Sequence, residues 1–208
     1  RYGTVTGVQT CALPIWICGL VKKLGRGHGT GFLPWVNGDR QSCASVSKGF
    51  FSFLALVIVS FFIAFPKVFL GGESFFYRDY GVLGYPFAQF LKESFLRGEI
   101  PVWNPLSNCG APFLAQWGTM ALYPGSWFFA ALPMPWSLGV FSLIHLVIAA
   151  AGARKLSFEW TRDSFAADLT GVAFGLGGVS VSCLTWPNYT VALAWMPWII
   201  WAVERAWQ

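Results

Sequence analysis

The chain has 208 residues, of which 55% are hydrophobic and only 11% are charged, and its formal net charge is +5. A soluble domain of this size would leave too much apolar surface in water, so the composition predicts an integral membrane protein. The basic residues gather beside apolar segments and form no stripe with interleaved aromatic residues, which is typical of membrane topology and argues against nucleic acid as a partner.

The first 48 residues differ from the rest of the chain. Residues 5–15 read VTGVQTCALPI and resemble the translation of a sequencing-library adapter, so we expect residues 1–15 to be an artefact outside the fold. Residues 16–48 are rich in glycine and carry five basic residues against the single acid Asp39, which predicts a cytoplasmic lead-in with little regular structure. The alternative is a signal peptide, which is disfavoured because the following apolar run is too long and has no small-residue cleavage site.

The first membrane helix is predicted at residues 49–70. This stretch is uncharged up to Lys67. Its helical length of roughly 33 Å, at about 1.5 Å per residue, is enough to cross the hydrocarbon core. The long side chain of Lys67 can extend to the far interface.

A short helix is predicted at residues 86–97, with Pro86 at its first position and Gly98 just past its end. Apolar residues at spacings of three and four occupy one face of this helix, and polar residues occupy the other. Glu93 and Arg97 can pair on the polar face. Such a helix is expected to lie along the membrane surface.

The remainder of the first loop, which runs over residues 71–135, is less regular. Residues 97–118 contain too many prolines for a regular helix. Residues 120–134 are apolar but too short and too broken by proline to span, so we interpret them as an interfacial or re-entrant segment.

Three further spans are predicted at residues 136–158, 165–184 and 190–205. The positive-inside rule is satisfied when the lead-in, the basic turn at residues 154–162 and Arg205 are all cytoplasmic, which leaves the large first loop outside. The sequence therefore predicts an all-α polytopic membrane protein with about four transmembrane helices and a large extracytoplasmic first loop that contains a surface helix. Because the sequence stops just after the last span and its flanking charges, we expect an N-terminal fragment of a longer protein.

Asp79 is the leading candidate for chemistry. It follows the first span closely and stands next to Arg78 among aromatic residues. An acid near the bilayer surface is partly removed from water, which suits a general base. The alternative is an ordinary contact between Arg78 and Asp79 in a loop.

Glu93 and Glu99 could each supply a second carboxylate to a metal ion or to an acceptor, but Glu93 already has a helix partner. Trp103 and Asn104 stand in the turn PVWNP and could stack on and hydrogen-bond a sugar or a lipid headgroup. The alternative for Trp103 is an interfacial anchor.

Ionisable and small residues also fall inside the predicted spans. His145 is a functional candidate by position, while a neutral imidazole bonded to a neighbouring helix is the more common case. Asp168 can face the helix bundle or reach the interface. The five cysteines show no CxxC pair and no metal-ligand spacing with the two histidines. Four glycines of the third span indicate close helix packing rather than a phosphate loop, namely Gly171, Gly175, Gly177 and Gly178.

Four short stretches together carry a resemblance to a known family. They are GEIPVWNP, CGAPFLA, LYP and AWMPWIIWAVERAW. Together they resemble the YfhO-type family of bacterial membrane proteins over about residues 50–207. That family is grouped with the GT-C glycosyltransferases, which are polytopic enzymes that take a sugar from a polyprenyl-phosphate carrier on the outer face of the membrane.

The resemblance implies a bacterial inner-membrane protein with a cytoplasmic N-terminus, whose partners are membrane lipid and a polyprenyl-phosphate sugar donor. It implies that Asp79 is the catalytic acid of the first outer loop and deprotonates the acceptor hydroxyl or holds a divalent cation, the cofactor itself being left open. Arg78 would stabilise the departing lipid phosphate, and Glu99, Trp103 and Asn104 would bind substrate. The competing hypothesis is a non-enzymatic polytopic protein, either a transporter or a lipid-binding scaffold subunit.

Overall fold

The computed structural model describes residues 42–70, 73–107 and 109–207, with side chains from residue 49 onward. Contacts divide the chain into two units, residues 1–44 and 45–208, and the helices below belong to the second unit apart from the first three residues of α2. The adapter-like segment and residues 16–41 of the lead-in lie outside the described residues.

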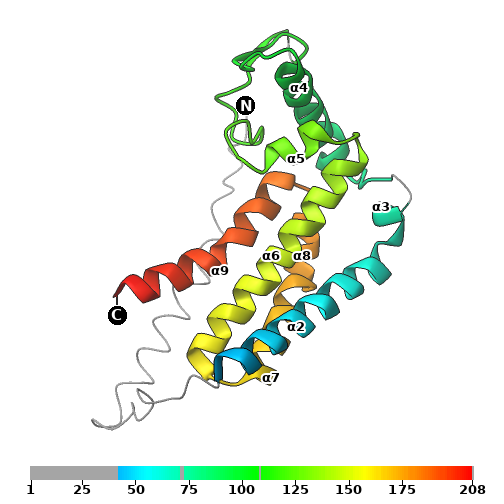
Figure 1. Cartoon of the computed structure of the whole chain (residues 1–208). Coiled ribbons are helices and arrows are strands. Elements are labelled where there is room, and N and C mark those ends of the chain that lie inside the picture. The colour runs from blue at the N-terminus through cyan, green and yellow to red at the C-terminus, as the bar shows by residue number, and fades with distance from the viewer. Residues whose placement is uncertain (1–41, 71–72, 108, 208) are drawn as a thin grey trace, which may run out of the picture. The chain divides into compact units, whose positions relative to one another are not determined.

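The described part of the chain is mostly helical, as predicted, and α6 (Trp136–Thr161) is its central helix. Helices α7 (Ser164–Gly175) and α9 (Pro187–Trp207) pack along α6, as Figure 1 shows. Helix α8 (Gly178–Cys183) follows α7 and packs against α9. Two stretches are long and apolar enough to cross a membrane by length and composition, namely Trp136–Thr161 and Ser164–Cys183, and Gly49–Ala64 is a shorter apolar helix.

The predicted first and third spans are each broken in the structure. Residues 49–70 form α2 (Ser42–Ala64) and α3 (Pro66–Leu70), because the residue before a proline is disfavoured in helical conformation. The third span divides into α7 and α8 at residues 176–177, where Gly177 takes an extended conformation with φ −63° and ψ 153°. Each predicted span is thus interrupted, while Ser164–Cys183 taken as a whole is still long and apolar enough to cross a membrane.

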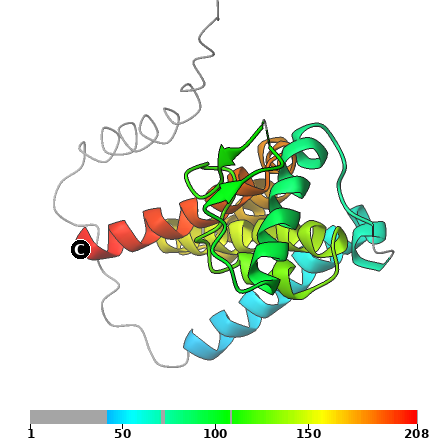
Figure 2. The same ribbon diagram turned by 90° about the horizontal axis from the view of Figure 1, so that it is seen from above.

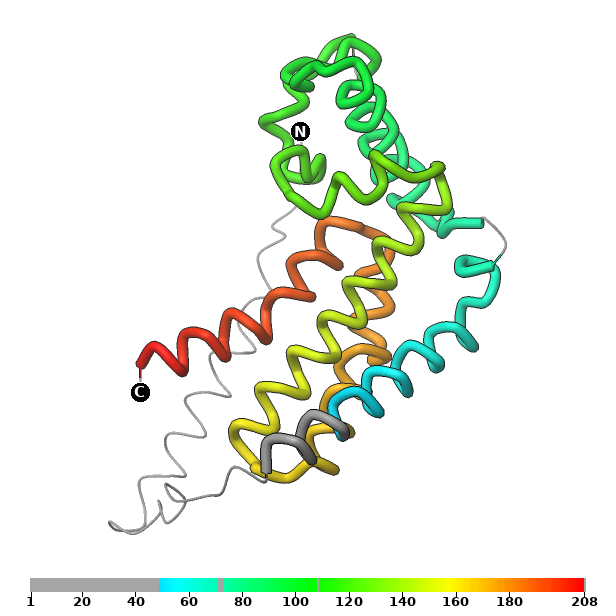
Figure 3. The backbone as a smooth tube through the Cα atoms, in the orientation of Figure 1, coloured from blue at the N-terminus to red at the C-terminus, as the bar shows by residue number. Residues whose placement is uncertain are grey.

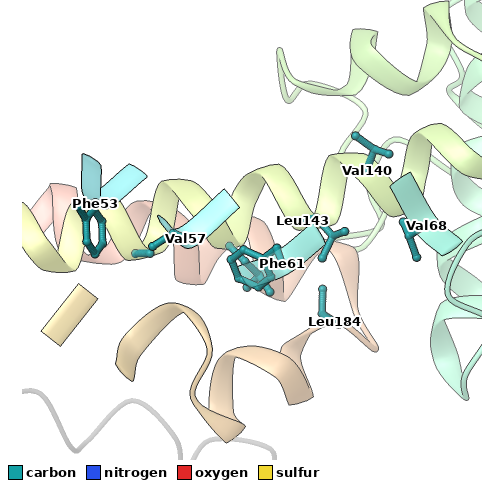
Figure 4. Packing of buried hydrophobic residues seen from close by; sticks show 9 residues of the cluster. Phe53, Val57, Phe61, Val68, Val140, Leu143 and Leu184 are labelled. Carbon is teal, nitrogen blue, oxygen red and sulfur yellow. The ribbon is translucent and has the colours of Figure 1, made fainter. Parts of the chain in front are cut away.

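The bundle is held by a core between α2, α6 and the end of α8. Phe53, Val57 and Phe61 are spaced four residues apart on α2 and are buried against Leu143 and Leu146 of α6, and Figure 4 shows this row of side chains along α6. Close approach requires glycine in α7. A Cβ at Gly171 would lie 2.5 Å from the Phe53 ring, and one at Gly175 would lie 2.7 Å from Ala150 Cβ. The predicted role in helix packing is confirmed for these two glycines.

The segment between α3 and α6 begins with a π-helix, η2 (Tyr80–Gly84), which leads directly into α4 (Tyr85–Leu96). The predicted helix is confirmed, and Gly98 follows it with φ +71°. The predicted pair between Glu93 and Arg97 was wrong. Arg97 Nε instead contacts Glu99 Oε2 at 3.0 Å, and Glu93 accepts a hydrogen bond of 2.8 Å from Gln89 Nε2.

Residues 97–131 fold over the apolar face of α4. A two-stranded antiparallel hairpin, β1 (Trp103–Asn104) and β2 (Ala111–Pro112), is followed by α5 (Ser126–Ala131), and the hairpin lies beside α4 in both Figure 1 and Figure 2. Phe113 packs against two phenylalanines of α4, and Trp127 stacks on Phe95 with ring centroids 4.3 Å apart. The aromatic residues of the following loop thus cover part of the apolar face of α4.

Candidate functional site

Asp79 stands at the N-terminus of η2, half-buried, beside the exposed Arg78, whose φ is +51°. Neither side chain makes a hydrogen bond or ion pair with any residue that the structure describes. The simple contact between Arg78 and Asp79, which was the alternative interpretation, is therefore not formed. The carboxylate is held at a defined place and its hydrogen-bonding capacity is unused within the described chain.

The backbone around Asp79 is fixed by its buried neighbour Tyr80. The Tyr80 hydroxyl lies 3.3 Å from Ser74 Oγ, and its ring packs edge-on against Phe75 with centroids 5.8 Å apart. Burial raises the pKa of the Tyr80 phenol to about 12. This side chain therefore remains neutral. It anchors the start of η2 in a hydrophobic core that also contains Leu91 of α4 and Phe113.

The other predicted site residues lie beyond the far end of α4. The helical stretch from Tyr80 to Leu96, continuous in Figure 3, is roughly 25 Å long at about 1.5 Å per residue. Glu99 follows its C-terminal end and contacts Arg97. The structure thus places Asp79 and Glu99 at opposite ends of one rod, where a small substrate cannot touch both.

Trp103 and Asn104 lie in the hairpin that follows α4, and both have local roles there. The exposed Trp103 ring lies over Gly110, where a Cβ would come within 2.7 Å of it. Asn104 is buried, and its Oδ1 accepts a hydrogen bond of 2.9 Å from the Leu106 amide. That bond shapes the WNP turn, so the Asn104 carbonyl oxygen is engaged by the protein itself.

A different set of aromatic residues lies close to η2. Gly84 approaches α9 so closely that a Cβ would be 3.1 Å from Pro187, the residue after Trp186. Trp117 stacks on Trp186 with centroids 5.9 Å apart and contacts Tyr189 at 5.4 Å. We call Trp117, Trp186 and Tyr189 the outer aromatic cluster. Sequence reasoning missed it because its members come from two segments far apart in the chain.

His145 of α6 is buried and belongs to a chain of hydrogen bonds. Its Nδ1 donates to the Phe141 carbonyl at 2.8 Å, and its Nε2 lies 2.7 Å from the Tyr123 hydroxyl. Trp195 Nε1 of α9 donates to the same hydroxyl at 3.0 Å. The neutral tautomer with its proton on Nδ1 gives every donor an acceptor, because Tyr123 then donates to Nε2. The expected bonded imidazole is confirmed, although its side-chain partner Tyr123 lies in the loop before α5 rather than in a neighbouring helix.

Arg154 was interpreted as a flanking charge at the end of a span, and this was wrong. Its side chain is only 6% exposed, lies near the rings of Phe50 and Phe53, and donates from Nε to Asp168 Oδ1 at 2.5 Å. Asp168 is 39% exposed. The open question about Asp168 is thereby answered, since it faces the bundle and neutralises a buried guanidinium.

The donor set around Asp79 does not fit a protein-held metal ion. Within the described ranges no three His, Cys, Asp or Glu side chains gather into a possible metal site, and a single carboxylate is a weak ligand set for a divalent cation. No family model, no curated protein and no solved structure matches the chain.

Proposed function

We propose that the chain is the N-terminal part of a YfhO-type polytopic protein of the bacterial inner membrane, with four spans and the N-terminus in the cytoplasm. The outward sides of the bundle helices support this topology, since α2, α7, α8 and α9 all expose large apolar residues. The end of η2 and the start of α9 lie together at one end of the bundle, where a Cβ on Gly84 would be 3.1 Å from Pro187. Glu159 of α6 and Arg205 of α9 meet 3.5 Å apart at the other end.

We further propose that this protein transfers a sugar from a polyprenyl-phosphate donor to an extracytoplasmic acceptor. The observation that carries the proposal is the free carboxylate of Asp79, which stands at the start of η2 and has no partner among the described residues. The other end of η2, at Gly84, approaches Pro187, which follows Trp186 of the outer aromatic cluster. Aromatic faces can stack on the apolar face of a sugar ring, and a free carboxylate can take a proton.

The proposed reaction is a direct displacement. Asp79 accepts the proton of the acceptor hydroxyl as that oxygen bonds to the anomeric carbon. The bond from the anomeric carbon to the lipid phosphate breaks, and its electron pair leaves with the phosphate. The exposed guanidinium of Arg78, adjacent in sequence, is available to stabilise the negative charge of the departing phosphate.

The test is Asp79→Asn, assayed for transfer from a lipid-linked sugar in membranes that contain the protein. The substitution keeps the shape of the side chain and removes its basicity, so we expect transfer to fall about 100- to 10,000-fold with unchanged membrane insertion. Glu93→Gln is the matched control, because Glu93 contacts only Gln89 on the surface of α4. Transfer at the parental rate by the Asn variant would remove the catalytic role.

The second candidate is a transporter or lipid-binding scaffold. It is favoured by the polar groups inside the bundle, where Arg154 pairs with Asp168 and His145 bonds to Tyr123. Ionisable groups within spans often mark transport pathways. Normal activity of the Asp79→Asn variant would favour this function if an Asp168→Asn variant that still folds and inserts into the membrane also lost solute uptake.

A further inference from the structure

A second cluster of charged and aromatic side chains lies between α6 and α9, at the end of these helices opposite to Asp79. Lys155 Nζ of α6 lies 5.4 Å from the centroid of the Trp201 ring of α9. The Arg205 guanidinium carbon lies 5.5 Å from the same centroid. We call Lys155, Trp201 and Arg205 the inner cluster.

Trp201 contributes a hydrogen-bond donor without an acceptor. Its Nε1 is buried and is the only buried side-chain nitrogen or oxygen without a partner in the described part of the chain. A buried donor without an acceptor is destabilising, and such groups are rare in native proteins. Trp198, one turn earlier on the same helix, shows the usual state, because its Nε1 donates to the Ile148 carbonyl at 3.0 Å.

The basic side chains near Trp201 also outnumber the acidic side chains near it. Glu159 is shared between Arg162, at 3.4 Å, and Arg205, at 3.5 Å. Glu204, the neighbour of Arg205, accepts a hydrogen bond from Trp160 Nε1. Lys155 forms no ion pair with any described residue, and its ammonium group lies over the Trp201 ring. The inner cluster thus presents one indole N–H and one unpaired ammonium group, and what it lacks is an anionic acceptor.

We propose that the inner cluster binds a phosphate group and that this phosphate belongs to an anionic membrane lipid. The phosphate pairs with the Lys155 ammonium and the Arg205 guanidinium beside the Trp201 ring, and it accepts the Trp201 N–H after a side-chain rearrangement that exposes the buried Nε1. A lipid suits the site better than a free ion because Ile199 and Val203 of the same helix are exposed and apolar. Acyl chains can cover these residues while the headgroup reaches the charged end of the bundle.

Native mass spectrometry of the purified chain in detergent tests this site, with phosphatidylglycerol and phosphatidylcholine as competing lipids. We expect the parental chain to retain phosphatidylglycerol preferentially. Lys155→Gln should weaken retention about tenfold or more, since a hydrogen bond to a charged group contributes on that scale, and Trp201→Phe should weaken it several-fold by removing the N–H while keeping a ring. Lys67→Gln is the control, because Lys67 is exposed beyond the opposite end of α2.

Each other outcome would overturn the proposal. Equal retention of the two lipids by the parental chain would show that the site does not select an anion. Unchanged retention in Lys155→Gln and Trp201→Phe, or an equal loss in Lys67→Gln, would place the lipid elsewhere. Displacement of phosphatidylglycerol by excess inorganic phosphate would assign the site to the free ion. The assay reads lipid adducts rather than sugar transfer, so its result is independent of the role of Asp79.

Discussion

Replacing Tyr123 by phenylalanine tests the hydrogen-bond chain that ties the outer loop to the bundle. The hydroxyl of Tyr123 accepts from Trp195 Nε1 at 3.0 Å and donates to His145 Nε2 at 2.7 Å. The substitution removes this one oxygen and preserves the ring, which packs against Phe141. Both partners are then left without their bond at once.

The expected destabilisation follows from the burial of the two partners. His145 is 4% exposed, so its Nε2 cannot be rehydrated without opening the bundle. An unsatisfied buried group costs about 1–3 kcal/mol in water-soluble proteins, whereas hydrogen bonds between membrane helices average nearer to about 0.6 kcal/mol. Trp195 is 42% exposed and can find another acceptor. We therefore expect Tyr123→Phe to lower the free energy of unfolding by about 1–2 kcal/mol.

The measurement is reversible unfolding in mixed micelles, with Trp195→Phe and the double variant completing a double-mutant cycle. A coupling energy between Tyr123 and Trp195 of about 0.5 kcal/mol or more is expected for groups in direct contact. Tyr189→Phe is the matched control, since its hydroxyl makes no hydrogen bond to a described residue. Equal free energies of unfolding for Tyr123→Phe and Tyr189→Phe would show that the hydrogen-bond chain contributes nothing to stability and would contradict the prediction.

Three further predictions concern other parts of the molecule. Asp168→Asn should lower the free energy of unfolding by about 1–3 kcal/mol, because it removes the charge that neutralises the buried Arg154 while Asp168 itself is 39% exposed, and an apolar replacement of both residues should restore much of it; equal loss in both variants would contradict this. Since burial raises the pKa of Tyr80 from 10.0 to about 12, the unfolded chain ionises first, and stability should fall as pH rises through that window. This fall should be smaller in Tyr80→Phe, as measured by chemical unfolding across alkaline pH. In sealed cells an impermeant thiol reagent should label the exposed Cys109, whereas a cysteine in place of Arg162 should stay unlabelled; the reverse pattern would invert the topology.

The helices themselves were readable from local sequence. Pro86 and Gly98 mark the two ends of α4 because proline fits the first helical turn and glycine readily adopts the positive φ after the last. The bounds of α6 were predicted to within a few residues, since its apolar run is long and uninterrupted. The breaks at Pro66 and Gly177 were readable in principle, but hydrophobicity alone does not reveal them.

The candidate site was only partly accessible to such reasoning. Asp79 stands out as an acid between aromatic residues in a chain with few charges, and its lack of a protein partner became visible only once the neighbouring segments were placed. Glu99 and Trp103 are near Asp79 in sequence, yet the straight rod of η2 and α4 carries them to its far end. Trp186 is distant in sequence, and the close approach of Gly84 to Pro187 brings it near η2.

The sequence alone determined the helical class, the apolar segments and the rich supply of aromatic residues, because these depend on composition and on periodicity within single segments. Tertiary structure decided the partners of the charged and polar groups. Arg154 has the same position in the sequence whether it faces lipid headgroups or Asp168, and only the packing of α6 against α7 selects the second. The unsatisfied N–H of Trp201 likewise cannot be predicted from the sequence, since a donor is unsatisfied only when none of its neighbours in the fold offers an acceptor.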